Sequence, residues 1–266
     1  MILHLQNFFL SLCQHVGQMI LHFCGAVGAL ALFIFESLKA VILPPHYPRH
    51  IVRQFIDIGY YSLPVVGMTA LFTGMVLALQ SYTGFARFNA EGAVASVVAL
   101  SVTRELAPVL AGLMVAGRIG ASMAAEIGTM KVTEQLDALR TLSTNPFQYL
   151  VAPRLIAGTI MLPLLVVIAD IIGIFGGYMV GVYKLNFNAA TYLKQTYDFL
   201  EYMDVMSGLT KAAAFGFIVA LMGCYHGYNS GRGAQGVGRA TTNAVVASSI
   251  LILIFNYLLT QAFFGN

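Results

Sequence analysis

The sequence has few charged residues, and this scarcity excludes most classes of soluble protein. Only 9% of its 266 residues are Asp, Glu, Lys or Arg, whereas 58% are hydrophobic before its 26 glycines are counted. Soluble domains carry about 25% charged residues and about 45–50% apolar residues with glycine included. A globule with so few charges could not cover its surface in water. The composition therefore excludes soluble enzymes and soluble nucleic-acid-binding proteins, and the formal charge of +3 is too small to indicate a polyanionic partner.

Other absences narrow the chemistry further. The three cysteines are widely spaced and the six histidines lack metal-ligand spacing, so neither a disulfide framework nor a metal site is predicted. The sequence has no GxxxxGK[ST] loop, so we expect no ATP binding, no enzymatic activity and no cofactor. Tryptophan is absent, so tyrosines are expected to form the belt at the membrane interface. The candidates are Tyr60, Tyr61, Tyr183, Tyr225 and Tyr228.

Long apolar stretches predict an all-α fold, a polytopic bundle of membrane helices. A membrane-spanning helix needs about 20 mostly apolar residues. Five stretches meet this requirement, at about 58–83, 94–125, 150–182, 207–228 and 244–264. A sixth, at about 16–35, contains Gln18 and His22, and we favour an N-terminal helix that is interfacial or partly embedded over a sixth span. The chain is thus divided into an N-terminal region, 1–53, and a transmembrane domain, 54–266.

The connections between spans orient the bundle. Eight Lys or Arg lie in three connections that share one side, 36–53, 126–154 and 226–239. The alternate connections hold only Arg87, Lys184 and Lys194. By the positive-inside rule the richer side is cytoplasmic, which puts the C-terminus on the outer face. The outer connection 184–206 is polar and acidic and is long enough for a short external helix, whereas the glycine-rich run 231–238 is predicted to be a flexible cytoplasmic turn.

Small residues recur along two of the spans. The second span has Gly112, Ala116, Gly120, Ala124 and Gly128, and the third has Gly173, Gly177 and Gly181. Such rows let helix backbones approach closely in lipid. We interpret the rows as packing within one chain, with a dimer seam as the open alternative. Three prolines, Pro64, Pro108 and Pro163, fall inside the predicted spans and favour kinks.

Charged residues inside the spans are the first candidates for a functional site. Arg104 and Glu105 lie near the middle of the second span, Asp170 lies in the third and Lys211 lies just inside the fourth. A charge at the bilayer centre costs at least about 2.5–3.5 kcal/mol, so these groups should face protein or water. We expect Lys211 to pair with Glu105, neighbouring helices to satisfy Asp170, and Arg118 to snorkel toward the cytoplasmic end of its span.

Two interpretations of these charges remain open. The first is an internal ion-pair network that fixes the register of the helices. The second is a polar patch in a cavity that receives a charged head group, because the planar fork of arginine suits phosphate.

The cytoplasmic connection 126–154 adds a further pattern. An N-cap and an acidic first turn are formed by Thr133, Glu134, Gln135 and Asp137. An apolar face is formed by Val132, Leu136 and Leu139. The pattern predicts a short amphipathic helix that binds a partner, with an inert connector as the alternative.

Several of these segments resemble the MlaE family of ABC-transporter permeases. The resemblance rests on the run 126–140 with Asn145-Pro146 and Ala152-Pro153-Arg154, on Arg104-Glu105-Leu106-Ala107-Pro108 with Ala116-Gly117-Arg118, and on the tail from Arg239-Ala240-Thr241-Thr242 to Gly265-Asn266. It covers nearly everything from residue 53 onward. The first 50 residues match only in character, as an apolar and partly embedded helix, and for this reason we do not count a sixth span.

The resemblance implies a homodimeric permease of the inner membrane of a Gram-negative envelope. Such a permease works with a cytoplasmic ATPase, a small STAS-domain protein and a periplasmic MCE-domain hexamer to move phospholipid between the inner and outer membranes. The coupling helix on the ATPase would comprise Thr133, Glu134, Gln135, Leu136, Asp137, Leu139 and Arg140. The positions matching polar residues near the lipid cavity are Arg104, Glu105 and Lys211. Asn256 stands where some relatives have an acidic residue, which argues against a charge network that reaches the fifth span.

Two other functions remain as alternatives. One is a secondary transporter that uses Glu105, Lys211 and Asp170 as a proton relay. Such transporters usually contain inverted repeats and broken helices, and the absence of a sequence repeat argues against this alternative. The other is a membrane scaffold that only anchors a partner complex, in which the buried charges are architectural.

Overall fold

The computed structural model describes residues 2–45, 47–88 and 90–265, with side chains from residue 17 onward except residues 22 and 23. In this part of the chain every regular element is helical, and six helical segments are long and apolar enough to cross a membrane. The predicted polytopic helix bundle is therefore confirmed. The helices are α1 (Ile2–Ile42), α2 (Pro48–Ile58), α3 (Leu63–Phe85), α4 (Val94–Ser101), α5 (Ala107–Val115), α6 (Ala121–Val132), α7 (Gln135–Thr141), α8 (Ala152–Tyr183), α9 (Ala189–Phe199), α10 (Tyr202–Tyr228) and α11 (Gly233–Phe264).

The second predicted span is one long helix in which two turns are widened. The segments α4, α5 and α6 are joined by π-helical turns at Val102–Leu106 and Ala116–Gly120. A third π-helical turn, Phe147–Val151, leads into α8. Turns of this kind are rare and frequently lie at functional sites. The first two carry Arg104, Glu105 and Arg118, the charged residues of this span.

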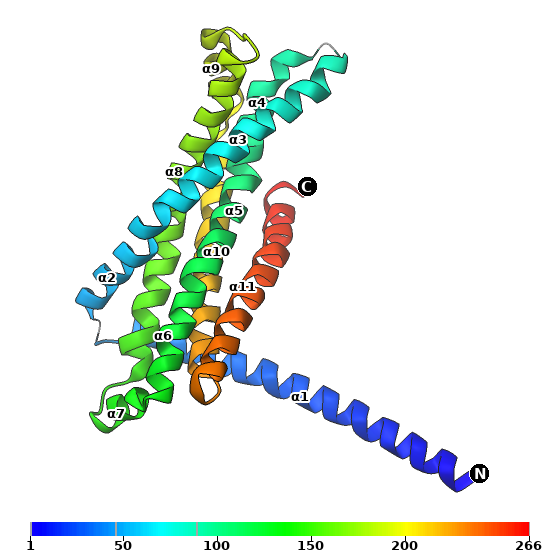
Figure 1. Cartoon of the computed structure of the whole chain (residues 1–266), viewed down its shortest axis with the longest axis vertical. Coiled ribbons are helices and arrows are strands. Elements are labelled where there is room, and N and C mark those ends of the chain that lie inside the picture. Colours follow the sequence, from blue (N-terminus) through cyan, green and yellow to red (C-terminus); the bar gives the residue numbers. More distant parts are fainter. Residues whose placement is uncertain (1, 46, 89, 266) are drawn as a thin grey trace.

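The bundle has one helix at its centre and a short helix at each end (Figure 1). The central helix, α10, packs against α5, α6, α8 and α11. At one end α7 connects α6 to the turn before α8, and at the other end α9 connects α8 to α10. The short helix that was expected in this connection is thus present, and its place on the outer face stays a prediction. Asn188 caps it, since its Oδ1 accepts hydrogen bonds from the backbone of Ala190 at 3.0 Å and Thr191 at 3.1 Å.

Glycines permit backbone contact between the central helices. A Cβ at Gly216 of α10 would collide with the carbonyl of Gly158 on α8, and a Cβ at Gly74 of α3 would collide with the backbone of Gly173. The small-residue row of the second span faces α10 and α11, because Gly120 lies against Val219 and Ser248. Both rows therefore pack within the chain, as interpreted from the sequence, and they are not free to form a dimer seam.

Two local predictions are wrong. The glycine-rich run is not a flexible turn, because α11 begins at Gly233 and is helical from there onward. Packing overrides the low helix propensity of glycine at this point, since Val237 contacts the position of Gly128 on α6. Pro64 does not kink a span either. It occupies the first turn of α3, where a missing backbone donor costs nothing.

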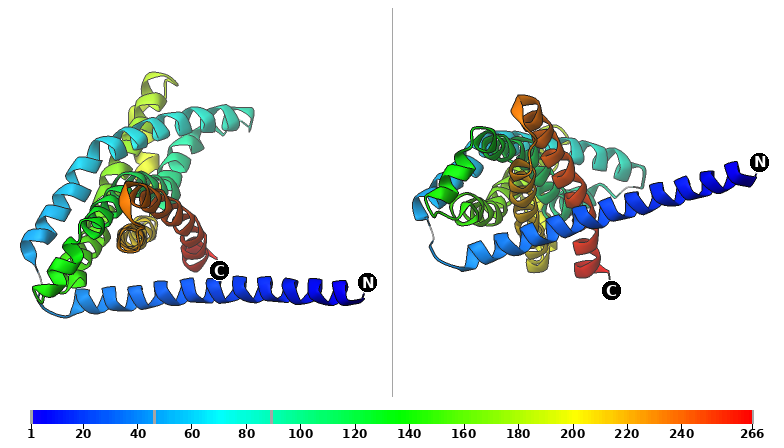
Figure 2. Two further views of the ribbon diagram at one scale, coloured as in Figure 1. Left: turned by 60° about the horizontal axis from the view of Figure 1, so that its bottom comes forward. Right: turned by 90° about the horizontal axis from the view of Figure 1, so that it is seen from below.

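The N-terminal helix α1 leaves the bundle at the end that bears α7 and runs away from it (Figures 1 and 2). Its contact with the bundle is centred on the buried ring of Phe33, which packs against Phe147, Tyr225 and Tyr228. Tyr225 and Tyr228 therefore belong to an aromatic cluster rather than to the predicted belt. The segment Gly17–Ile42 is long enough to cross a membrane, so the interfacial position of α1 stays a prediction.

Candidate functional site

The intramembrane charges form a compact cluster around a closed ion pair. Lys211 on α10 is fully buried, and its Nζ lies 2.6 Å from Oε1 of Glu105, as predicted. Glu105 also accepts hydrogen bonds from two residues of α11, Asn256 Nδ2 at 2.9 Å and Thr260 Oγ1 at 2.9 Å. The fifth span thus contributes no charge to this cluster. An amide and a hydroxyl of that span connect it to the carboxylate by hydrogen bonds instead.

A proline explains why Lys211 can also bind the backbone of the second span. Pro108 has no N–H, so it cannot donate to the carbonyl of Arg104 four residues earlier, and the helix opens into a π-helical turn at this point. The Nζ of Lys211 donates to that carbonyl at 2.9 Å. An uncapped carbonyl would be costly in the membrane. The lysine thus compensates for the proline while it neutralises Glu105.

Arg104 points to a different partner that the sequence analysis did not identify. Its Nε and Nη2 lie 2.6 Å and 2.5 Å from Oδ1 of Asp204, whose side chain is only 1% exposed. The Asp204 Oδ2 also accepts the backbone N–H of Glu201 at 3.0 Å, in a capping box at the start of α10. The Glu201-x-x-Asp204 spacing is the signal that could have located this residue. The ring of Phe264 lies 4.3 Å from the guanidinium carbon and covers one face.

The Arg104 side chain keeps one part of its guanidinium accessible. It is 33% exposed, and among the described residues its Nη1 makes no hydrogen bond. The cluster of Arg104, Glu105, Asp204 and Lys211 is neutral overall, with two cations and two anions. A neutral, hydrogen-bonded cluster with one accessible guanidinium edge can fix the register of the helices and still bind an oxygen anion.

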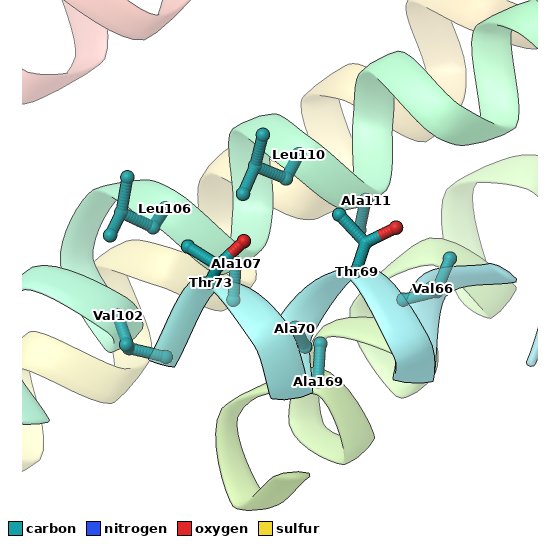
Figure 3. Close-up of a pocket in the computed structure, with 10 residues that line it drawn as sticks. All are labelled: Val66, Thr69, Ala70, Thr73, Val102, Leu106, Ala107, Leu110, Ala111 and Ala169. Atoms are coloured by element: carbon teal, nitrogen blue, oxygen red, sulfur yellow. The ribbon is translucent and has the colours of Figure 1, made fainter. Parts of the chain in front are cut away.

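The opposite face of the same turn is apolar. Val102 and Leu106, four residues apart, line a pocket between the second span, α3 and α8 (Figure 3). The only polar side chains in its lining are Thr69 and Thr73 of α3. Thr69 donates its hydroxyl to the carbonyl of Val65 on its own helix, so it adds little polarity. This wall suits hydrocarbon, whereas the face with Arg104 suits an anion.

Asp170 does not join the cluster. Its side chain is 8% exposed, and its Oδ1 has no hydrogen-bond partner among the described residues. The expectation that neighbouring helices satisfy it is wrong for this oxygen, because the surrounding positions of α8 are apolar, such as Val166 and Ala169. Of the three members of the proton-relay alternative, Glu105 and Lys211 are hydrogen-bonded to each other, whereas Asp170 shares no hydrogen bond with either in the part of the chain that the structure describes.

The predicted coupling segment folds into α7, with different end residues. Thr133 ends α6 instead of capping the next helix, and Glu134 takes the N-cap position in a left-handed conformation, with φ of 59°. Leu136 is buried and Leu139 is half-buried, so they face the bundle. The exposed members of the predicted set are Thr133, Glu134, Gln135, Asp137 and Arg140.

Three polar contacts attach this end to the rest of the bundle. Arg140 of α7 donates to the hydroxyl of Tyr228, the last residue of α10. The Nζ of Lys131 donates to the carbonyl of Ser230 just after α10, at 2.9 Å. Glu126 of α6 pairs with the buried Arg154 of α8, with 2.7 Å between Oε2 and Nη2. The short helix is therefore fixed to the central helix.

Comparison with known proteins places the chain in a family. The sequence model of the family described as Permease MlaE matches residues 51–262. A probable ABC transporter permease protein of Rickettsia felis is 61% identical over 255 residues, which cover 96% of this chain and 98% of that protein. The intermembrane phospholipid transport system permease protein MlaE of Haemophilus influenzae is 35% identical over 254 residues, 94% of this chain and 96% of that protein. A probable ABC transporter permease protein of a Synechocystis strain is 42% identical over 216 residues, 81% of this chain and 82% of that protein. The match spans every helix of the bundle from α3 to α10 and the candidate site, and the chain belongs to the MlaE family of ABC-transporter permeases.

Proposed function

We propose that this chain is the membrane permease of an ATP-driven transporter that moves phospholipids between the inner and outer membranes. The Haemophilus influenzae relative, an intermembrane phospholipid transport system permease protein, supports the substrate and the route. The observation that carries the proposal is the accessible edge of Arg104, which lies beside a closed ion pair on a turn whose other face is apolar. Such a site offers a phosphate ligand and a hydrocarbon wall within one helix turn.

In this mechanism Arg104 binds the head-group phosphate through its free Nη1, while Asp204 and Phe264 hold the guanidinium in place. Acyl chains lie along apolar surfaces such as the face of the second span that carries Val102 and Leu106; the pocket between these residues and α3, about 10 Å³, is too small to hold a chain in this conformation. The pair of Glu105 with Lys211 keeps the helices in register. Transport requires that the site bind lipid more tightly in one state of the bundle than in the other.

The coupling helix α7 connects this site to the motor. A cytoplasmic ATPase docks on the exposed face of α7, where Glu134, Gln135 and Asp137 are accessible. Arg140 and its contact with Tyr228 pass a displacement of α7 to α10. The helix α10 carries Asp204 and Lys211 at its other end, so its motion changes the surroundings of Arg104. The ATP-hydrolysing machinery belongs to the partner.

The assembly proposed around this chain follows the family. Two copies form a homodimer in the inner membrane, with α7 in the cytoplasm and the C-terminus in the periplasm. A periplasmic MCE-domain hexamer meets the end that bears α9, and a STAS-domain protein accompanies the ATPase. The region 1–53 lies at the interface, and 54–266 is the transmembrane domain. The secondary-transporter alternative is less well supported, because Asp170 shares no hydrogen bond with the cluster in the described part of the chain.

The test measures phospholipid transfer between proteoliposomes that contain the full chain and its ATPase. Arg104→Gln is expected to lower ATP-dependent transfer at least tenfold, because it removes the charge that meets the phosphate. Arg104→Lys, which keeps the charge and loses the fork, should recover part of the activity. Arg87→Gln is the matched control, since Arg87 is exposed and makes no hydrogen bond among the described residues.

Each alternative predicts a different result. Normal transfer by Arg104→Gln, with the ATPase still bound, would remove Arg104 from the head-group role and favour the scaffold. Transfer driven by a proton gradient without the ATPase would favour the relay. ATP hydrolysis by the isolated chain would contradict the assignment of the motor to a partner.

A further inference from the structure

A second arginine in the spans lacks an ionic partner. Arg118 belongs to the second π-helical turn, and none of the ion pairs among the described residues includes it. It lines a pocket of about 230 Å³ between α2 and α6. The polar side chains of this pocket are Arg53, Gln54, Asp57, Arg118, Ser122 and Glu126.

The hydrogen bonds of the Arg118 guanidinium anchor it at one nitrogen, and the ring of Tyr61 lies 5.8 Å from its central carbon. Its Nη1 donates to the hydroxyl of Ser62 at 2.8 Å and to the carbonyl of Asp57 at 3.3 Å. Ser62 is 2% exposed, so the anchor is a buried group at the start of α3. The side chain that was expected to snorkel is thus held by two hydrogen bonds. Among the described residues Nε and Nη2 make no hydrogen bond, and the guanidinium keeps two nitrogens for a ligand.

The charges around the pocket leave one positive charge unbalanced. Glu126 is neutralised by the buried Arg154, with 2.7 Å between their charged atoms. Asp57 and Arg53 face each other at 3.9 Å on α2, and both are exposed. These two pairs cancel, so the charge of Arg118 remains. An unpaired cation in a membrane protein is unfavourable unless water or an anion reaches it.

The depth of Arg118 identifies the anion. The apolar run of α11 from Ala244 to Phe264 is about 30 Å long, the thickness of the hydrocarbon core. Gly120 lies against Ser248, about one turn inside the end of that run near Ala244. Arg118 therefore lies near one boundary of the hydrocarbon, at the end of the bundle that bears α7. The anions available at this boundary are the phosphates of phospholipids.

We propose that the pocket between α2 and α6 binds the phosphate of a phospholipid from the leaflet on the α7 side, with Arg118 as its main ligand. Arg53, whose pair with Asp57 is exposed and long at 3.9 Å, and Ser122, whose hydroxyl lies 3.5 Å from Oε1 of Glu126, turn toward the same phosphate as a second cation and a hydroxyl donor. This head-group site is separate from the cluster around Arg104, which lies near the opposite end of α11 beside Thr260 and Phe264. Binding here does not depend on the role of Arg104 in transport.

The test counts lipids bound to the full chain, delipidated in detergent, by native mass spectrometry. The probe is dioctanoyl phosphatidylglycerol. Two control compounds distinguish a lipid head group from a free phosphate as the ligand. Dioctanoylglycerol lacks the phosphate, and glycerol 3-phosphate lacks the acyl chains. Arg118→Gln is expected to weaken one site at least tenfold, and Arg118→Lys should restore part of the affinity. Arg232→Gln, on an exposed arginine outside the pocket, is expected to bind like the unmodified chain.

Two further variants keep the result interpretable. Arg104→Gln should leave the site sensitive to Arg118→Gln, so that failure of the transport proposal is distinguishable from failure of this one. Arg53→Gln preserves both anchors of Arg118 and should weaken binding several-fold even where Arg118→Gln does not fold. Equal lipid binding by Arg118→Gln and the unmodified chain would overturn the proposal. Tight binding of glycerol 3-phosphate alone would also overturn it. A loss of dimer mass in Arg118→Gln without loss of lipid would overturn it as well, because it would assign the charge of Arg118 to contact with a second copy.

Discussion

Removing the charge of Glu105 should destabilise the bundle more than removing the charge of its partner. Lys211 is fully buried, whereas the Glu105 side chain is 37% exposed. In Glu105→Gln a buried ammonium loses its counter-charge, which costs about 3–5 kcal/mol when one member of a buried ion pair is deleted. In Lys211→Met the carboxylate keeps the hydrogen bonds of Asn256 and Thr260, but the carbonyl of Arg104 loses its donor, so we expect about 1–3 kcal/mol.

The double variant Glu105→Gln with Lys211→Met tests the reasoning directly. Both charges are then absent, and an apolar chain fills the place of the lysine stem. Replacing a buried pair with uncharged groups is often neutral, so the double variant should be more stable than Glu105→Gln alone. At about 2–4 °C per kcal/mol, Glu105→Gln should lower Tm by about 6–20 °C, and the double variant should recover part of that loss.

A thiol-reactive dye provides the assay, because the chain has no tryptophan. In a background that carries Cys13→Ser and Cys24→Ser, the remaining thiol is that of Cys224, which is buried in α10 and reacts only on unfolding. The protein is heated in detergent at fixed lipid content, and the midpoint of labelling is compared among the four chains. Additive losses in the double variant, or a larger loss in Lys211→Met than in Glu105→Gln, would refute the account of the buried ion pair.

Two other predictions concern packing and coupling. Gly216→Ala should lower the labelling midpoint by several degrees or prevent folding, because its Cβ would collide with the backbone of Gly158. Gly117→Ala is the control and should leave the midpoint unchanged, because nothing lies within 4 Å of a Cβ at that position. An equal effect of both variants would contradict the proposed close approach of α8 and α10. Glu134→Lys should weaken capture of the ATPase at least tenfold in a pull-down, and the labelling midpoint should not change because the side chain is exposed. Leu136→Ala should lower the midpoint, because that side chain is buried. Undiminished capture by Glu134→Lys would place the docking surface elsewhere.

Composition and periodicity were sufficient for the fold class but not for the local details at the ends of elements. The apolar runs locate the spans because lipid tolerates no unpaired backbone, so length and hydropathy almost determine a helix. The start of α11 at Gly233 and the end of α6 at Thr133 were predicted incorrectly. The start of α11 depends on a contact from a distant segment, the packing of Val237 on α6, which a propensity argument does not contain. At the end of α6 the Thr133 hydroxyl donates back to the carbonyl of Thr129 instead of capping the next helix.

The candidate site, like the fold, could be predicted from the sequence only in part. Charge in an apolar run identified Arg104, Glu105 and Lys211, and the cost of an isolated charge predicted the Glu105–Lys211 pair that the structure contains. Asp204 was missed because it lies at the polar start of α10, where an acidic residue needs no special explanation. Its partnership with Arg104 follows from the three-dimensional register of two helices 100 residues apart in sequence.

The position of α10 explains how events at the two ends of the bundle are linked. One end is held through Tyr228 by α7, and the other holds Arg104 through Asp204. Between them the helix is closely packed, since Gly216 and Gly223 bring its backbone against α8 and α6 and leave no space for a local bend. Close-packed interiors have low compressibility and transmit displacement. In the proposed coupling, a force applied at α7 therefore reaches α10 through the exposed contact of Arg140 with Tyr228 and moves α10 together with the residues around Arg104, provided that this contact holds.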